Sequence, residues 1–195
     1  DQANSKLIDF EDAKAQPWNQ YHSKHAISFV GGGDATILRI NSDNRGKAKT
    51  ASGEYSISND ANYPDTSANH PLNILFDEGV KAAGFYLGNG NQYGEQVKAT
   101  ISLYDENREL LAEFNEQYVS DSVTTFFGVE SNEPIHLIVI DYGNSLLSEE
   151  IDDLMYVDFL LYDNMPDPAT PSFKCGDSRG DDGYYSACPK DTIRH

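Results

Sequence analysis

Alternation of apolar and polar residues is the feature that most constrains the fold of this chain. Residues 72–76 and 97–103 place an apolar side chain at every second position, and residues 135–140 form a denser apolar run suited to a central strand. A period of two is the spacing of side chains on one face of a β-strand, whereas an amphipathic helix repeats every 3.6 residues. The sequence therefore predicts strands.

Similar short runs recur along the chain, and turns rich in Gly, Asn and Asp separate them. The expected strands are 7–10, 27–30, 36–40, 55–58, 72–76, 82–87, 97–103, 110–114, 124–129, 135–140 and 154–162. Many short strands at about ten-residue spacing are typical of antiparallel sandwiches and barrels. We expect an all-β fold.

Composition divides the chain into three parts. Residues 1–163 carry the expected strands, residues 164–171 include three prolines that favour an extended linker, and residues 172–195 form an acidic tail too short for a core of its own. The chain opens with Asp1 rather than Met, which is typical of a protein whose leader has been removed. In an exported protein, Cys175 and Cys188 of the tail would form a disulfide; two free thiols are the alternative.

The charge balance excludes several classes of partner. The chain has 14 Lys and Arg against 32 Asp and Glu, a formal net charge of −18. Binding to nucleic acid or to an anionic membrane surface requires clustered Lys and Arg, so neither is expected. No apolar run approaches the roughly 20 residues of a membrane-spanning helix, so we expect no membrane insertion. Cations and neutral polymers remain as partners.

Three stretches, in order, resemble a known family. They are Leu7-Ile-Asp-Phe-Glu-Asp12 at the start, 71–77 with 83–89 and 101–107 in the middle, and Ile151-Asp-Asp-Leu-Met-Tyr156 at the end. Together they resemble the secreted bacterial β-sandwich (jelly-roll) domains of cell-surface and exopolysaccharide-associated proteins, which are similar to carbohydrate-binding modules and MAM-type adhesion domains. The resemblance implies a calcium-stabilised, non-catalytic, extracellular or cell-surface domain whose partner is a polysaccharide or cell-surface glycan.

The resemblance also implies a calcium site. Glu11 and Asp152 match the family's metal-binding positions, and Asp34 could add an oxygen from a loop. Ca²⁺ takes six to eight oxygen ligands, and carboxylates supply them readily. The alternative is that these acids belong to solvated faces, because acidic clusters arise often in a chain with 32 Asp and Glu.

Aromatic and amide side chains in turns are the candidates for sugar binding, because sugar rings stack on aromatic planes and amides bond their hydroxyls. The aromatic candidates are Trp18, Tyr21, Tyr55, Tyr63, Tyr86 and Tyr93, and the amide candidates are Asn62 and Asn89. The alternative for each ring is packing inside the sandwich.

Two other functions remain open from the sequence. A structural subunit of an extracellular matrix, pilus or filament would self-associate, and the tail could contact a neighbouring copy. A polysaccharide-degrading enzyme would need a pair of carboxylates at a suitable separation. The sequence has no Gly-x-Ser-x-Gly motif and no His-Glu-x-x-His motif, so we expect a protein that is not an enzyme.

Overall fold

The computed structural model describes residues 5–11, 16–18, 26–31, 35–39, 49–59, 70–89, 97–143 and 148–159. All of them belong to one compact unit, Asp1–Met165. The linker and the tail, including both cysteines, lie outside the described residues. In the described part, no helix is long and apolar enough to cross a membrane.

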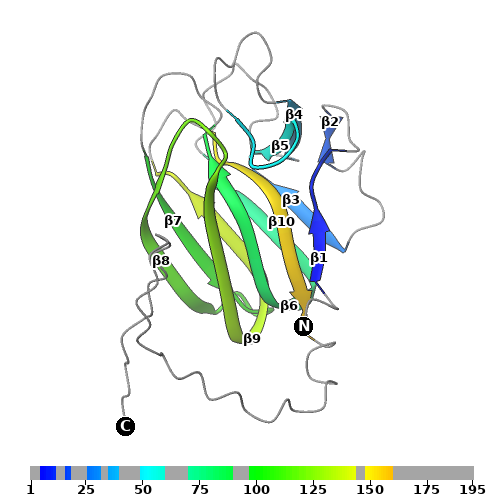
Figure 1. Ribbon diagram of the computed structural model, residues 1–195. Coiled ribbons are helices and arrows are strands. Elements are labelled where there is room, and N and C mark those ends of the chain that lie inside the picture. Colours follow the sequence, from blue (N-terminus) through cyan, green and yellow to red (C-terminus); the bar gives the residue numbers. More distant parts are fainter. Residues whose placement is uncertain are drawn as a thin grey trace, which may run out of the picture. The chain divides into compact units, whose positions relative to one another are not determined.

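The described residues of this unit form ten strands (Figure 1). They are β1 (Ser5–Ile8), β2 (Gln16–Pro17), β3 (Ile27–Val30), β4 (Thr36–Arg39), β5 (Tyr55–Ser58), β6 (Leu72–Gly88), β7 (Val97–Tyr104), β8 (Leu110–Val119), β9 (Thr125–Asp141) and β10 (Glu150–Asp158). Each ladder between these strands is antiparallel. The prediction of an all-β antiparallel fold is confirmed.

The sheet folds into two layers because β6 and β9 bend together. Their ladder is irregular between Leu75 and Ala82. A Cβ on Gly79 of β6 would lie 2.4 Å from Cβ of Pro134 in β9, so the two bends pack closely and leave no room for a side chain there. Each strand therefore contributes one half to each layer, whereas the sequence predicted separate shorter strands.

The first layer contains β10 at its centre, and β10 pairs with β1, β5 and the second half of β6. The second half of β6 pairs in turn with residues 125–130 of β9, while β5 continues through β4 to β2. The second layer consists of β3, the first half of β6, residues 137–141 of β9, β7 and β8.

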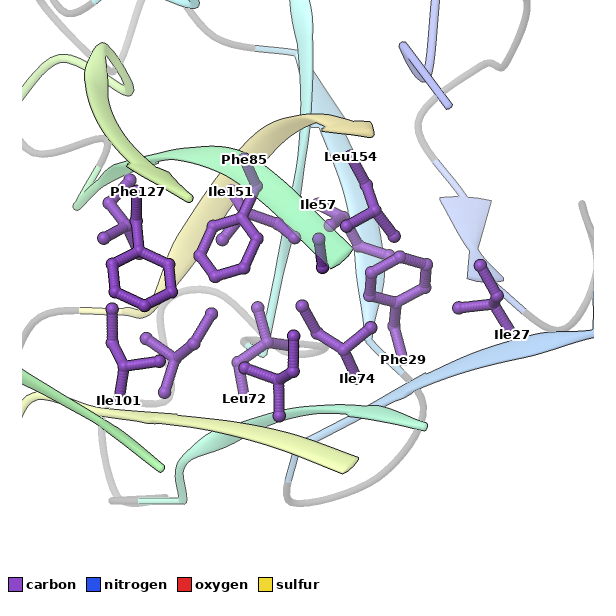
Figure 2. Packing of buried hydrophobic residues seen from close by; sticks show 14 of the residues in the cluster. Ile27, Phe29, Ile57, Leu72, Ile74, Phe85, Ile101, Phe127, Ile151 and Leu154 are labelled. Atoms are coloured by element: carbon purple, nitrogen blue, oxygen red, sulfur yellow. The ribbon is translucent and has the colours of Figure 1, made fainter. Parts of the chain in front are cut away.

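The hydrophobic core lies between the two layers (Figure 2). Phe85, Phe127 and Ile151 of the first layer point toward Leu72 and Ile101 of the second. Their neighbours in sequence must then point outward, because successive side chains of a strand alternate between its faces. This alternation places Tyr86, Phe126 and Asp152 on the outer face of the first layer.

Candidate functional site

The beginning of the chain and its last described strand converge. β1 pairs with β10 so that Leu7 lies opposite Met155 and Ile8 lies opposite Leu154. Residues that follow β1 and residues near the start of β10 therefore lie at the same end of the layer. Glu11 and Asp152 both reach the segment 51–55, which precedes and opens β5.

Glu11 binds this segment through its carboxylate. The Glu11 Oε1 atom accepts hydrogen bonds from the backbone N–H groups of Glu54 and Tyr55, each at 2.8 Å. Hydrogen bonds to a charged acceptor are stronger than those between neutral groups. Glu11 thus connects the end of β1 to the start of β5, two regions more than 40 residues apart.

Asp152 and its neighbour bind the same segment from β10. Asp152 Oδ2 accepts a hydrogen bond from the Ser52 N–H at 2.9 Å, and Asp153 Oδ1 accepts one from the Ser52 hydroxyl at 2.8 Å. Asp152 is fully buried. Burial raises the pKa of the Asp152 carboxyl to about 7, and the nearby charge of Asp153 adds to that effect.

Three of the five described residues with positive φ angles lie beside these acids. Phe10, Gly53 and Asp153 have positive φ angles of 62°, 48° and 49°. A Cβ on Gly53 would lie 1.9 Å from Cδ of Glu11, so only glycine leaves room for that carboxylate. Strained residues persist where surrounding contacts over-determine them, and such places are often functional.

The described acids do not by themselves form a complete metal site. Within the described ranges, no three His, Cys, Asp or Glu side chains are grouped so that they could hold a metal ion. Asp34, the third expected ligand, lies outside the described residues. The structure does bring the carboxylates of Glu11 and Asp152 to one segment, 51–55.

An aromatic pair, one ring exposed and the other half-buried, lies on the outer face of the first layer. Tyr86 of β6 and Phe126 of β9 are cross-strand partners, and their ring centroids lie 5.3 Å apart. The pair is adjacent to the acids, since Tyr86 is also the cross-strand partner of Asp152. Phe126 is 53% exposed, which is high for so large an apolar side chain.

Two glycines determine how the Phe126 ring lies. Gly84 and Gly128 are cross-strand partners directly beside the pair. Cβ atoms added to them would lie 3.1 and 2.9 Å from the outer atoms of the Phe126 ring. The ring therefore lies over this glycine pair, where side chains would lift it away from the sheet. We refer to Tyr86, Phe126, Gly84 and Gly128 as the aromatic platform.

A cavity of about 510 Å³ elsewhere in the unit offers a different environment. Phe76 and Tyr156 contribute to its lining, and both are buried. Lys6 Nζ lies 5.4 Å from the Tyr156 ring centroid and forms an ion pair with Asp158 at 2.5 Å. Because a paired lysine covers the ring, this cavity is a poorer place for sugar stacking than the aromatic platform.

A buried carboxylate connects the ends of several strands. Glu149 Oε1 accepts a hydrogen bond from the Tyr142 N–H at 2.9 Å, and Oε2 accepts one from the Asn59 side-chain amide. The same amide donates to the backbone oxygen of His70, whereas Asn59 Oδ1 is buried without a partner. Burial raises the pKa of Glu149 to about 7.

The predicted sugar-binding residues are placed as follows. Trp18 is 3% exposed, and its Nε1 donates a hydrogen bond to the Ile27 carbonyl at 3.0 Å. It packs edge-on against Phe10 and Phe29, so no face of its ring is open for stacking. Asn89 is likewise buried. Tyr21, Asn62, Tyr63 and Tyr93 lie outside the described residues.

Sequence reasoning included Tyr86 among the aromatic candidates but missed Phe126. The signal was present, because Phe126 and Phe127 are consecutive in a strand, and one of two consecutive rings must face outward. The glycines opposite each other in β6 and β9 could not be recognised without the register that pairs Gly84 with Gly128.

Comparisons with known proteins return structures but no sequence relatives. No family model matches the chain, and no curated protein matches it. The cleaved K2 adhesin domain of Lys-gingipain is similar at a TM-score of 0.44 and 11% identity, covering 74% of this chain and 97% of that chain. An α-L-arabinofuranosidase solved with arabinose is similar at a TM-score of 0.49 and 9% identity. The match covers 78% of this chain but only 26% of the arabinofuranosidase chain.

A carbohydrate-binding module is similar as well. CBM51 from GH95 of Clostridium perfringens, solved with methyl-galactose, has a TM-score of 0.37 and 14% identity, covering 78% of this chain and all of that chain. These neighbours are thus adhesin and carbohydrate-binding domains, together with part of a larger glycosidase. They assign no role to any residue of this chain, whose two-layer fold is defined by its own strand pairing.

Proposed function

We propose that this chain is a carbohydrate-binding or adhesion domain that acts outside the cell and does not transform its ligand. The observation that carries this proposal is the aromatic platform. It combines an exposed ring, Phe126, with a second ring, Tyr86, on an otherwise ordered sheet face.

The physical argument concerns the match between such rings and sugars. One face of many pyranose rings presents mainly C–H groups, and these pack favourably against an aromatic surface. Because Gly84 and Gly128 carry no side chains, the Phe126 ring can lie close to the sheet. Asp153, beside the platform, and the Tyr86 hydroxyl are suitable partners for sugar hydroxyls.

The test is binding to a glycan array, followed by affinity electrophoresis in each polysaccharide that scores. Phe126→Ala should weaken binding at least tenfold. Tyr118→Ala is the matched control, since Tyr118 is 54% exposed but lies on β8 of the other layer. Equal binding by wild type and Phe126→Ala would refute the platform, and absence of binding to every glycan would refute the proposed function.

We further propose that Ca²⁺ binds between Glu11 and Asp152. Both carboxylates contact the segment 51–55, and Asp152 is buried at a high cost in desolvation, as its raised pKa indicates. A divalent cation would favour the ionised form of that carboxylate. It would also strengthen the connection between β1, β5 and β10, which is the stabilising role we assign to it.

Thermal unfolding with Ca²⁺ and with chelator tests this site. Binding to the folded state alone contributes about 2.7 kcal/mol at a hundredfold excess over Kd, so the Tm should rise by several degrees. Glu11→Gln or Asp152→Asn should abolish the response, whereas Glu106→Gln in the turn before β8 should retain it. Identical melting curves with Ca²⁺ and chelator would contradict the proposal.

For the tail, we propose that Cys175 and Cys188 form a disulfide, as expected for an exported protein. Intact mass should increase by that of two hydrogen atoms on reduction. Alkylation of both cysteines in freshly purified, unreduced protein would contradict the pairing.

A further inference from the structure

We propose that the binding surface continues from the aromatic platform across the first layer to β1, and that it holds an internal segment of an extended, β-1,4-linked polysaccharide. This inference rests on the proposed function and adds the class of ligand. The surface is a line of three apolar side chains, Leu7, Met155 and the ring of Phe126, which we call the apolar row.

The strand register places these side chains in one line. Leu7 of β1 is the cross-strand partner of Met155 in β10, which is in turn the partner of Gly84 in β6. Gly84 is the partner of Gly128 in β9. The Phe126 ring fills the place that these two glycines leave, because Cβ atoms added to them would lie 3.1 and 2.9 Å from its atoms. The ring therefore continues the line that Leu7 and Met155 begin.

The apolar row lies on the outer face of the layer and is exposed at both ends. Ile8 is 5% exposed and belongs to the core, so its neighbour Leu7 points outward, where it is 58% exposed. Phe126 is 53% exposed at the other end, and Met155 between them is half-buried. The other large apolar side chains that are exposed in the described part all belong to β8. On the first layer, such exposure is thus confined to this row.

The row crosses four strands, β1, β10, β6 and β9 (Figure 1). Neighbouring strands lie about 4.8 Å apart, so the distance from β1 to β9 is about 14 Å. A pyranose unit of an extended chain is about as long as one strand spacing, which gives the row room for about three units. Among the described residues, neither β1 nor residues 125–130 of β9 pairs with a further strand. A sugar chain can therefore continue past both ends, as an internal segment of a polymer must.

A straight apolar row favours some linkages over others. In β-1,4-linked glucose or xylose the linkages and ring hydroxyls are equatorial, so each ring presents C–H groups on its flat faces and successive rings form a ribbon. Such a ribbon can bury its C–H faces on Phe126, Met155 and Leu7 in turn. An α-1,4-linked chain coils, so its successive rings turn away from a straight row.

A protein partner, including a second copy of this chain, is the alternative occupant. Taking roughly 150–250 Å² for a large side chain in full, the exposed parts of Leu7, Met155 and Phe126 total on the order of 250 Å². A stable protein–protein interface buries about 800 Å² on each partner. The neighbouring row on the same face consists of Ser5, Val157, Ala82 and Glu130. It begins and ends with polar side chains, so the apolar surface is narrow, which suits a thin polymer better than a protein.

Isothermal titration calorimetry with oligosaccharides of one to six units tests the inference. The β-1,4-linked series are cello- and xylo-oligosaccharides, and the α-1,4-linked series is malto-oligosaccharides. For a β-1,4-linked series, we expect the affinity to increase at least tenfold from the single sugar to the trisaccharide and to change little from the tetrasaccharide to the hexasaccharide. The β-1,4-linked hexasaccharide should bind at least tenfold more tightly than maltohexaose.

Variants at the far end of the row separate it from the aromatic platform alone. Leu7→Ala should weaken binding of the hexasaccharide several-fold and leave the single sugar unaffected, because Leu7 lies at the opposite end of the row from Phe126. Leu7→Trp should strengthen binding of the hexasaccharide, since it adds a ring on which a further sugar can stack. Leu110→Ala and Leu110→Trp are the matched controls, because Leu110 is 55% exposed on β8 of the other layer. They should bind every oligosaccharide like wild type.

The outcomes separate the two proposals. If binding depends on Phe126 but does not increase with chain length, or if both Leu7 variants bind like wild type, the apolar row is refuted and the proposed function stands. The same holds if wild type binds glycans on the array but neither β-1,4-linked series. If no glycan binds, or if Phe126→Ala binds like wild type, the proposed function fails and this inference fails with it. In sedimentation, a dimer that Leu7→Ala dissociates would identify the row as a self-interface and overturn the inference.

Discussion

Glu149 should make the stability of this protein decrease as the pH rises from 5 to 8. Its carboxyl is buried between Tyr142 and Asn59, and burial raises its pKa from the ordinary 4.5 to about 7. Between these two values the folded protein holds a proton that the unfolded chain has released. Stability therefore falls with increasing pH across this window, since the unfolded chain binds fewer protons.

The size of the effect follows from the two pKa values. A difference of one pKa unit corresponds to about 1.4 kcal/mol. The ionised Glu149 side chain should thus cost the folded state about 3 kcal/mol above pH 7, relative to its protonated form below pH 4.5. Between pH 5 and pH 8 the change should be roughly 2–3 kcal/mol, because part of the effect is already present at pH 5.

Glu149→Gln isolates this contribution. The amide keeps the shape of the side chain and does not titrate. Its NH₂ group can donate to Asn59 Oδ1 once the Asn59 amide rotates, and that oxygen is buried without a partner in the wild type. The variant should consequently fold, and its stability should change less with pH than that of the wild type.

Urea unfolding followed by far-UV circular dichroism at pH 5, 6, 7 and 8 measures the difference. The free energy of unfolding of wild type should lose roughly 2–3 kcal/mol more than that of Glu149→Gln over this range. Glu106→Gln, in an exposed turn, is the control and should follow the wild type. Parallel pH profiles for wild type and Glu149→Gln would refute the reasoning.

Two further predictions concern the fold. Gly53→Ala should destabilise the protein by more than Gly143→Ala. Both glycines have positive φ, but an added Cβ meets the Glu11 carboxylate at Gly53 and nothing within 4 Å at Gly143. In chemical denaturation we expect a loss of about 2–3 kcal/mol for Gly53→Ala and about 1 kcal/mol for Gly143→Ala; equal losses would count against the contact with Glu11. Phe85→Ala should cost about 3–5 kcal/mol, because Phe85 is fully buried between the layers; a loss below 1 kcal/mol in the same assay would contradict the packing in Figure 2.

The sequence predicts strands well because alternation is local. Ile27–Val30 and Tyr55–Ser58 were predicted with the bounds that the structure has. The bends of β6 and β9 were interpreted as breaks between separate strands. Gly79 and Pro134 are turn-forming residues in isolation, and the close packing of the two bends at these positions cannot be recognised without the register that pairs β6 with β9.

The site was predictable in part. The resemblance names Glu11 and Asp152 together, and the pairing of β1 with β10 places both at the same end of the first layer. The segment 51–55 was not anticipated, since its contacts with Asp152 span about 100 residues. Trp18 was expected to bind sugar but packs in the core, because a single sequence does not tell which face of an aromatic ring is covered.

The most direct test of the central claim is to observe the Phe126 ring while a glycan binds. Aromatic ¹H–¹³C NMR spectra of Phe-labelled protein should be recorded during titration with an oligosaccharide of a neutral polysaccharide that scores on the array. The Phe126 ring signals, assigned with Phe126→Leu, should shift with ligand concentration, and those of Phe114 on the other layer should stay in place. Unchanged Phe126 signals at saturating ligand would contradict the assignment of the aromatic platform as the binding site.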